Sequence, residues 1–143
     1  MLTLSCHCGQ VRLQLGKRPD HINECNCSLC GKRGARWAYF HPSEVCVEGE
    51  TAGYSRRDKE APNADVRFCQ VCGCATHFRL TESAQARHGD VMVGVNMRLA
   101  DEGELAGIEL HYPDGRSWSG AGSFGYVREA RIMGAGQDRA DGP

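Results

Sequence analysis

The turn Cys69-Gln70-Val71-Cys72-Gly73, near the middle of the chain, decides the fold when it is combined with Cys6-His7-Cys8-Gly9 near the start. Each run places two thiols and a glycine on a short turn, and glycine tolerates the positive φ that such turns need. Zinc takes four thiolates in tetrahedral geometry at about 2.3 Å. The two turns, which we call knuckles, therefore supply one complete four-sulfur site. The expected ligands are Cys6, Cys8, Cys69 and Cys72.

Apolar and polar residues alternate on both sides of each knuckle. Residues 2–4 and 11–15 flank the first, and residues 66–69 and 75–80 flank the second. This period of two predicts strands, so each knuckle is the tip of a β-hairpin. We expect a mainly β fold in which one ion joins two hairpins and contributes to stability. Further strands are expected at 22–24, 35–40, 45–47, 51–55, 91–97 and, as the last strand, 108–112, with a glycine-rich irregular stretch from residue 117.

A second group of thiols lies in Cys25-Asn26-Cys27-Ser28-Leu29-Cys30. Three protein ligands leave one tetrahedral position for water or substrate, which is typical of a catalytic zinc site. Cys25, Cys27 and Cys30 are therefore candidate catalytic residues. Ser28 is expected to cap a helical turn that carries Cys30. The alternative is that these are core thiols, but the polar, turn-forming Asn26 and Ser28 between them disfavour it.

Three cations, Lys32, Arg33 and Arg36, follow the second group of thiols directly. A zinc ion bound by three thiolates carries net negative charge, which neighbouring cations would offset. The same cations would attract a substrate that carries carboxylates. The alternative for each of them is an ordinary solvated side chain.

The remaining thiols and two histidines have simpler interpretations. Alternation places Cys46 on a polar, exposed face, and Cys74 is expected to be a core thiol on the strand that leaves the second knuckle. His7 lies between two ligands and is expected to point outward. His77 is expected to be structural.

Length and composition limit the function classes. The 143 residues predict one domain over residues 1–133, and residues 134–143 have the composition of a disordered tail. The chain has 17 basic and 18 acidic residues, so its net charge is close to zero. Neither nucleic-acid binding nor membrane binding is therefore expected. No secretory signal or membrane span is recognisable. We expect a cytoplasmic protein, in which nine cysteines serve as metal ligands or reactive thiols and not as disulfides.

Three cysteine motifs occur in a specific order: Cys-x-Cys-Gly-x-Val at 6–11, Cys-x-Cys-Ser-x-Cys at 25–30 and Phe-Cys-x-x-Cys-Gly at 68–73. This order resembles the glutathione-dependent formaldehyde-activating enzyme family, which also includes centromere protein V. Val95-Asn96 is similar to a later strand of the family, and the likeness covers residues 3–112. The run Gly73-Cys74-Ala75-Thr76-His77 departs from the simpler Gly-Thr run of the family.

The resemblance implies a β-tent-like zinc fold, a coiled β-sheet related to the methionine-R-sulfoxide reductases. It implies two zinc ions per chain, a structural one on the four-thiol set and a catalytic one on Cys25, Cys27 and Cys30. The implied reaction is carbon-sulfur lyase chemistry, the reversible addition of the glutathione thiol to formaldehyde to give S-hydroxymethylglutathione. Glutathione or a related small thiol is then the expected substrate, and no segment is assigned to holding it.

Two other functions remain open from the sequence. The chain could be a non-catalytic zinc-binding interaction module, in which a histidine or a partner closes the three-thiol site. It could also be a thiol redox protein that uses Cys25, Cys27 or Cys30 as its nucleophile.

Overall fold

The computed structural model describes residues 1–134 and consists mainly of β-strands in two sheets, so the predicted mainly β class is confirmed. The smaller sheet has the order β1-β2-β5 and is antiparallel. Its strands are β1 (Leu2–Ser5), β2 (Arg12–Leu15) and β5 (Val45–Glu48). Leu4 pairs with Leu13 in the first hairpin, which places both leucines on the buried face.

The larger sheet has eight strands in the order β11-β10-β3-β4-β9-β8-β7-β6. Only β3 and β10 run parallel among its neighbouring pairs in residues 1–134. The strands are β3 (His21–Asn23), β4 (Trp37–Phe40), β6 (Thr51–Ser55), β7 (Ala64–Cys69), β8 (Ala75–Leu80), β9 (Val93–Asn96), β10 (Glu109–Pro113) and β11 (Tyr126–Ile132).

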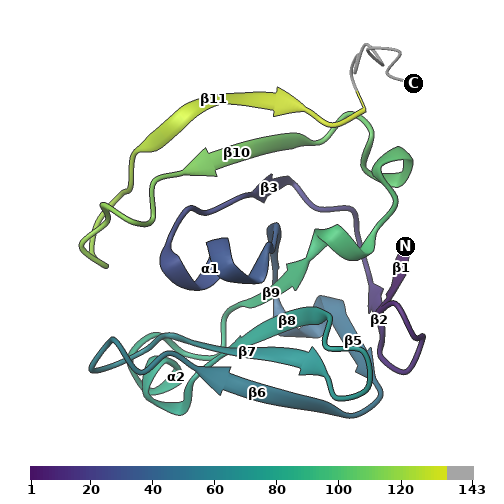
Figure 1. The fold of residues 1–143 in the computed structure, drawn as a ribbon, viewed down its shortest axis with the longest axis horizontal. Helices are drawn as coiled ribbons and strands as arrows, with labels where there is room; N and C mark the ends of the chain where they lie inside the picture. The colour runs from purple at the N-terminus through teal and green to yellow at the C-terminus, as the bar shows by residue number, and fades with distance from the viewer. Residues whose placement is uncertain (135–143) are drawn as a thin grey trace.

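The larger sheet curves around the short helix α1 (Ser28–Arg33). In Figure 1, β10 and β11 lie above α1 and β6, β7 and β8 lie below it. A second helix, α2 (Glu82–His88), follows β8 and is capped by the Thr81 side chain. Three 3₁₀ turns complete the described secondary structure, at Pro42–Glu44, Met97–Leu99 and Glu102–Leu105.

Two groups of buried side chains hold this arrangement together. The larger group joins both sheets, with Leu4, Leu13, Ile22, Val95 and Leu110 at 2% exposure or less. A smaller group packs against α1 through Leu29 and Cys30. Its buried members are Ala35, Trp37, Val66 and Phe78. The second group therefore supports the segment that carries the three clustered thiols.

The structure confirms both hairpins and the strand expected within residues 91–97, which is β9. It differs from the sequence prediction in one strand and one helix. The strand β10 was predicted to be the last, but β11 follows it and pairs with it. The exposed side chains of β11 lack the alternation that marks a half-buried strand. The helix α2 was also not predicted, because it has only seven residues and one buried side chain, Ala84.

The predicted tail falls almost wholly on residues 135–143, which lie outside the described residues. Within residues 1–134 we find no helix that is both long and apolar enough to cross a membrane.

Candidate metal centres

The two knuckles meet and bring four sulfur atoms together. The Sγ atoms of this four-thiol cluster all lie within 4.8 Å of one another, and its members are Cys6, Cys8, Cys69 and Cys72. The Sγ of Cys8 is 3.6 Å from that of Cys6 and 3.6 Å from that of Cys69. A regular tetrahedron with metal-sulfur bonds of about 2.3 Å has edges of about 3.8 Å. The donor set and its spacing therefore fit one zinc ion.

Each knuckle is closed by a hydrogen bond from its glycine to its first cysteine, over three residues in the first knuckle and over four in the second. The N–H of Gly9 donates to the carbonyl of Cys6 at 3.0 Å, and the N–H of Gly73 donates to that of Cys69 at 2.9 Å. Both glycines have a φ of 78°, where a side chain is strained. A backbone N–H also donates to the Sγ of each first cysteine, from Val11 just after the first knuckle at 3.3 Å and from Val71 inside the second at 3.4 Å. Such N–H donors stabilise a thiolate.

The second group of thiols converges at the start of α1. The Sγ atoms of this three-thiol cluster, Cys25, Cys27 and Cys30, lie within 4.8 Å of one another. Cys27 caps α1, because its Sγ accepts from the N–H of Cys30 at 3.4 Å. Ser28, the predicted cap, is the first helical residue instead. A sulfur cap accepts a helix N–H and remains available to a metal.

A buried tryptophan holds the third thiol of this cluster. The Nε1–H of Trp37 donates to the Sγ of Cys30 at 3.3 Å, and the Trp37 side chain is only 3% exposed. The ring of Phe78 packs edge-on against it at 5.1 Å between centroids. The position of Cys30 is therefore fixed by the apolar group under α1.

A loop that follows β10 covers one side of the three-thiol cluster. The side chain of Asn26 donates to Asp114 Oδ1 at 2.8 Å and accepts from the backbone N–H of Arg116 at 2.9 Å. Between these two contacts lies Gly115, where a Cβ would collide with the Sγ of Cys25. Only glycine lets the loop pass this close to the thiols.

Because the three thiols lie close together, their pKa values shift in opposite directions. Hydrogen bonds from Cys25 and Cys30 lower the pKa of Cys27 to about 2. Sharing hydrogen bonds with Cys27 raises the pKa of Cys25, and sharing them with Cys25 and Cys27 raises that of Cys30. The shared hydrogen bonds thus favour the thiolate form at Cys27 over the other two thiols, and a metal that takes all three sulfurs displaces their protons.

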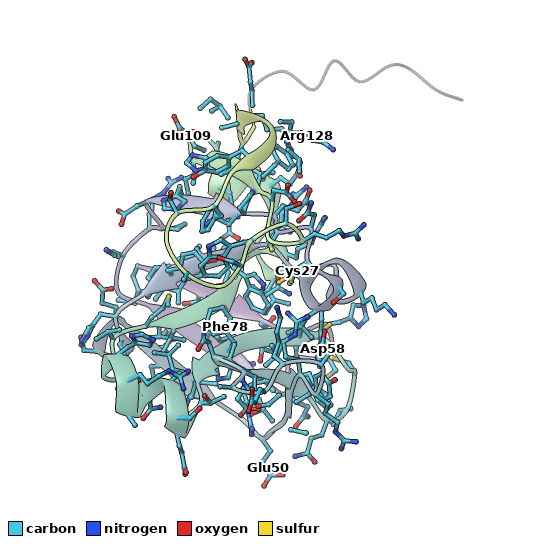
Figure 2. The ribbon with its side chains drawn as sticks, turned by 90° about the vertical axis from the view of Figure 1, so that its left-hand side faces the viewer. Cys27, Glu50, Asp58, Phe78, Glu109 and Arg128 are labelled. Carbon is cyan, nitrogen blue, oxygen red and sulfur yellow. The ribbon has the colours of Figure 1, made fainter. Side chains whose placement is uncertain are left out.

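The three-thiol cluster borders a cavity of about 280 Å³. Cys25 and Cys30 contribute to its wall, together with Arg98, Tyr112 and Arg128. The guanidinium of Arg128 lies over the ring of Tyr112 at 4.6 Å. Figure 2 shows Cys27 at mid-height, with Arg128 above it and Asp58 below it. Cys25 and Cys30 therefore border a space that can hold a small molecule.

Comparison with known proteins agrees with this arrangement of cysteines. The model of a family described as glutathione-dependent formaldehyde-activating enzyme matches residues 1–109. The chain belongs to this family. Among solved structures it is similar to a Rhodobacter sphaeroides protein from a structural genomics programme, with 28% sequence identity and a TM-score of 0.55. That similarity covers 70% of this chain and 88% of the other.

In this formaldehyde-activating family member, the three predicted cations do not lie together. Lys32 and Arg33 line a second cavity, between α1 and the end of β6. Arg36 instead donates to Glu24 Oε1 at 2.8 Å and lies 3.6 Å from Glu102. Arg98 also donates to Glu24, at 2.9 Å. Arg36 is thus held by two acidic side chains of the same chain, each of which also pairs with another arginine.

Sequence reasoning missed Arg56, which reaches the three-thiol cluster from the turn after β6. Its guanidinium donates twice to Asp58, at 2.6 Å each, and once to the Ser28 hydroxyl at 3.1 Å. These contacts with Asp58, and the nearby Cys27 sulfur, raise the pKa of Arg56. The only sequence signal was a charged loop over residues 56–63.

The other thiols and two histidines are not members of either cluster, although Cys74 shares a side-chain hydrogen bond with Cys72. His7 and Cys46 are exposed, and Cys74 packs partly buried against the larger apolar group. His77 is 1% exposed and shares a hydrogen bond with the Thr76 hydroxyl at 3.0 Å. Burial lowers the pKa of His77 to about 4.

Proposed function

We propose that this protein is a zinc-dependent carbon-sulfur lyase that reversibly adds the thiol of glutathione, or of a related small thiol, to formaldehyde. The observation that carries the proposal is the ligand count. The four-thiol cluster has a full tetrahedral set, whereas the three-thiol cluster offers three donors within residues 1–134 and borders a cavity. An incomplete set beside a cavity is typical of a catalytic zinc site.

The reaction forms one carbon-sulfur bond and breaks the π bond of the aldehyde carbonyl, and the thiol proton ends on the carbonyl oxygen. Zinc held by Cys25, Cys27 and Cys30 would supply the Lewis acidity that lowers the thiol pKa and polarises the carbonyl. Cys27 holds its sulfur at the start of α1, and Trp37 fixes Cys30. The covering loop at Gly115 closes one side and leaves the cavity as the approach for substrate.

The four-thiol cluster would hold a second, structural zinc, which gives two ions per chain. The surrounding compartment must keep nine thiols reduced, so we place the protein in the cytoplasm. The relation of this fold to the methionine-R-sulfoxide reductases stays a prediction. Lys32 and Arg33 are proposed to contact the substrate, and Arg36, with its two acidic partners, to support the site electrostatically.

Exchange NMR tests the proposed reaction. In an equilibrium mixture of glutathione and formaldehyde, zinc-loaded protein is expected to accelerate exchange between free glutathione and S-hydroxymethylglutathione. Cys27→Ser should reduce the rate to that of the mixture without protein. Cys46→Ser removes an exposed thiol outside both clusters and should leave the rate unchanged. If the zinc-loaded wild type does no better than the protein-free mixture, the proposed lyase activity is wrong.

A further inference from the structure

A fifth thiol lies beside the four-thiol cluster. The Sγ of Cys74 shares a side-chain hydrogen bond with that of Cys72 and accepts another from the backbone N–H of His7. Contacts with both knuckles thus fix its position. A tetrahedral zinc site is complete with four sulfur atoms, and Cys74 is not one of the four that converge. The cluster therefore has a spare thiol at its edge.

The part of the cluster beside the spare thiol is open to solvent. Cys72 and Cys74 are only partly buried, whereas Cys6 and Cys69 are 1% exposed. Cys8 is exposed too, but the sulfur atoms that lie 3.6 Å from its own belong to two fellow ligands. A sulfur bound to zinc is a thiolate, the form of cysteine that attacks oxidants. A small oxidant can therefore reach a nucleophilic sulfur at Cys72, with a thiol outside the ligand set next to it.

The backbone between Cys72 and Cys74 permits a disulfide. Cα atoms two positions apart are separated by at most ~7 Å, and a disulfide spans ~4.4–6.8 Å between Cα atoms. Gly73, the residue between them, has a φ of 78°, so the chain bends at this point. Both cysteines lie in the turn before β8, which begins at Ala75. The bond therefore does not require the strands of the hairpin to separate.

We propose that Cys72 and Cys74 form a redox site for hydroperoxides, in which Cys72 is oxidised and Cys74 converts the oxidised sulfur into a disulfide. This site goes beyond the proposed reaction. It rests on the structural zinc of the proposed function and not on the lyase chemistry.

The two steps balance with hydrogen peroxide as the oxidant. In the first, the Cys72 sulfur attacks one peroxide oxygen and the O–O bond breaks, which leaves a sulfenic acid on Cys72 and releases hydroxide. In the second, the Cys74 thiol attacks the Cys72 sulfur. An S–S bond forms, the S–O bond breaks, and water leaves with the thiol proton. The two sulfur atoms lose two electrons in total, and the peroxide gains them.

Oxidation at this site removes a ligand from the four-thiol cluster. With Cys72 in a disulfide, three sulfur atoms remain for the ion that joins the two hairpins. Because zinc binding is coupled to folding, loss of the ion lowers the stability of the fold. A reductant that opens the disulfide returns Cys72 to the cluster, whereas a sulfenic acid that is not captured is oxidised further to sulfinic acid, which thiols do not reduce. Cys74 therefore makes the loss of zinc reversible.

Mass spectrometry of the zinc-loaded protein after treatment with hydrogen peroxide tests the proposal. Trypsin releases the peptide of residues 68–79, which contains Cys69, Cys72 and Cys74. In the wild type we expect this peptide to lose two hydrogens, with fragments that place the bond between Cys72 and Cys74. In Cys74→Ser we expect Cys72 to gain two oxygens instead, as sulfinic acid. Cys46→Ser removes an exposed thiol outside both clusters and should match the wild type.

Recovery of the fold is the second measurement. Once the peroxide has been removed, dithiothreitol and zinc should return the unfolding midpoint of the wild type and of Cys46→Ser to its starting value. The midpoint of Cys74→Ser should stay low. Cys74→Ala is measured in parallel, and circular dichroism before oxidation checks that both variants fold. If neither folds, the position of the bond in the wild type decides the test.

Two results would overturn the redox site. One is a wild type in which peroxide forms no disulfide in this peptide or joins two of the four ligands, and the other is a Cys74→Ser protein that recovers as fully as the wild type.

Zinc analysis before oxidation separates this inference from the proposed function. A four-thiol cluster that does not take up zinc would contradict the structural ion. A zinc-loaded cluster without the Cys72–Cys74 bond would contradict the redox site alone. A protein that forms this bond but lacks exchange activity would contradict the lyase reaction and keep the redox site.

Discussion

The two cysteine clusters differ in where their thiols come from and in how far they are buried. The four-thiol cluster joins Cys8 to Cys69 across 61 residues, and its Cys6 and Cys69 are 1% exposed. The three-thiol cluster takes all its ligands from one stretch of six residues, and all of them are partly exposed. One cluster is a long-range cross-link with two buried and two solvent-accessible thiols, and the other is a local site at the edge of a cavity.

This difference indicates that the two metals contribute differently. An ion in the four-thiol cluster connects segments that are far apart in the unfolded chain, so its binding free energy becomes folding free energy. An ion in the three-thiol cluster restrains only residues that already share a turn and the start of α1. The stability of the fold should therefore depend on the ion in the four-thiol cluster, and activity on the ion in the three-thiol cluster.

The largest effect is expected from Cys72→Ser. Structural zinc supplies on the order of 10 kcal/mol, which is comparable to the ~5–15 kcal/mol that stabilises a typical domain. The variant should therefore lose its fold by circular dichroism and lose zinc in metal analysis. Cys46→Ser is the matched control, because Cys46 is exposed and lies outside both clusters. A folded Cys72→Ser protein with a normal unfolding midpoint would remove the distinction between the clusters.

Cys30→Ser should separate activity from stability. We expect zinc to fall from two ions to one per chain, with the fold kept and exchange activity lost. The loss of metal affinity should exceed the ~10–100-fold that follows changes outside the ligand set. Metal analysis with circular dichroism checks this expectation, and Cys46→Ser should match the wild type in both. Equal destabilisation by Cys30→Ser and Cys72→Ser would mean that the two clusters share one role.

Acid pH should lower the stability of the fold through His77, which lies on β8 after the second knuckle. Burial holds its pKa at about 4, below the ~6.5 of an exposed histidine. Between these values the unfolded chain binds a proton that the folded chain does not, so stability is full above about pH 6.5 and falls as the pH drops towards 4. The loss should reach about 2 kcal/mol by pH 5.

Urea unfolding at pH 7 and pH 5 with excess zinc measures this loss. His77→Gln should show a smaller pH dependence than the wild type, by about the same 2 kcal/mol. The comparison is sharpened by Cys30→Ser, which should keep the full pH dependence because the three-thiol cluster is not involved. If His77→Gln shows the same pH dependence as the wild type, the loss of stability at acid pH comes from protonation of the metal-binding cysteines and not from His77.

The smallest effect is expected from Gly115→Ala, which adds a Cβ against the Sγ of Cys25. The covering loop must move, at a cost of about 1 kcal/mol. We expect weaker cobalt binding at the three-thiol cluster in absorption titrations, with no change at the four-thiol cluster. Gly125→Ala is the matched control, because a Cβ there meets no atom within 4 Å. Equal cobalt titrations for both variants would show that the loop does not restrain the thiols.

The parts of the site that could be predicted from sequence are those encoded by short spacing. Both knuckles and the three-thiol stretch were recognisable because their ligands lie within a few residues of one another. The flanking strands were recognisable because half-buried strands alternate. Even within these stretches one detail was wrong, because Ser28 was expected to cap α1 and the sulfur of Cys27 does so.

The parts that were missed are those that distant pairings bring to the site. Gly115 reaches Cys25 because β10 pairs in parallel with β3, and Asn26 holds the loop across 88 residues. Arg56 reaches Ser28 across 28 residues, from a turn whose charges look like ordinary solvated side chains. Local spacing contains no signal for such contacts, since they depend on the order of strands in the sheet.

The parallel pair of β3 and β10 has a consequence for the growing chain on the ribosome. The thiols of the first and second knuckles have all been made once residue 72 is added, so the cross-linking metal can be captured while later strands are still missing. The loop that covers Cys25 comes more than 80 residues after the thiols it covers. We therefore expect a nascent chain to expose three reactive sulfurs until residues 114–116 have been made, and to need a metal donor or a reducing partner during that interval.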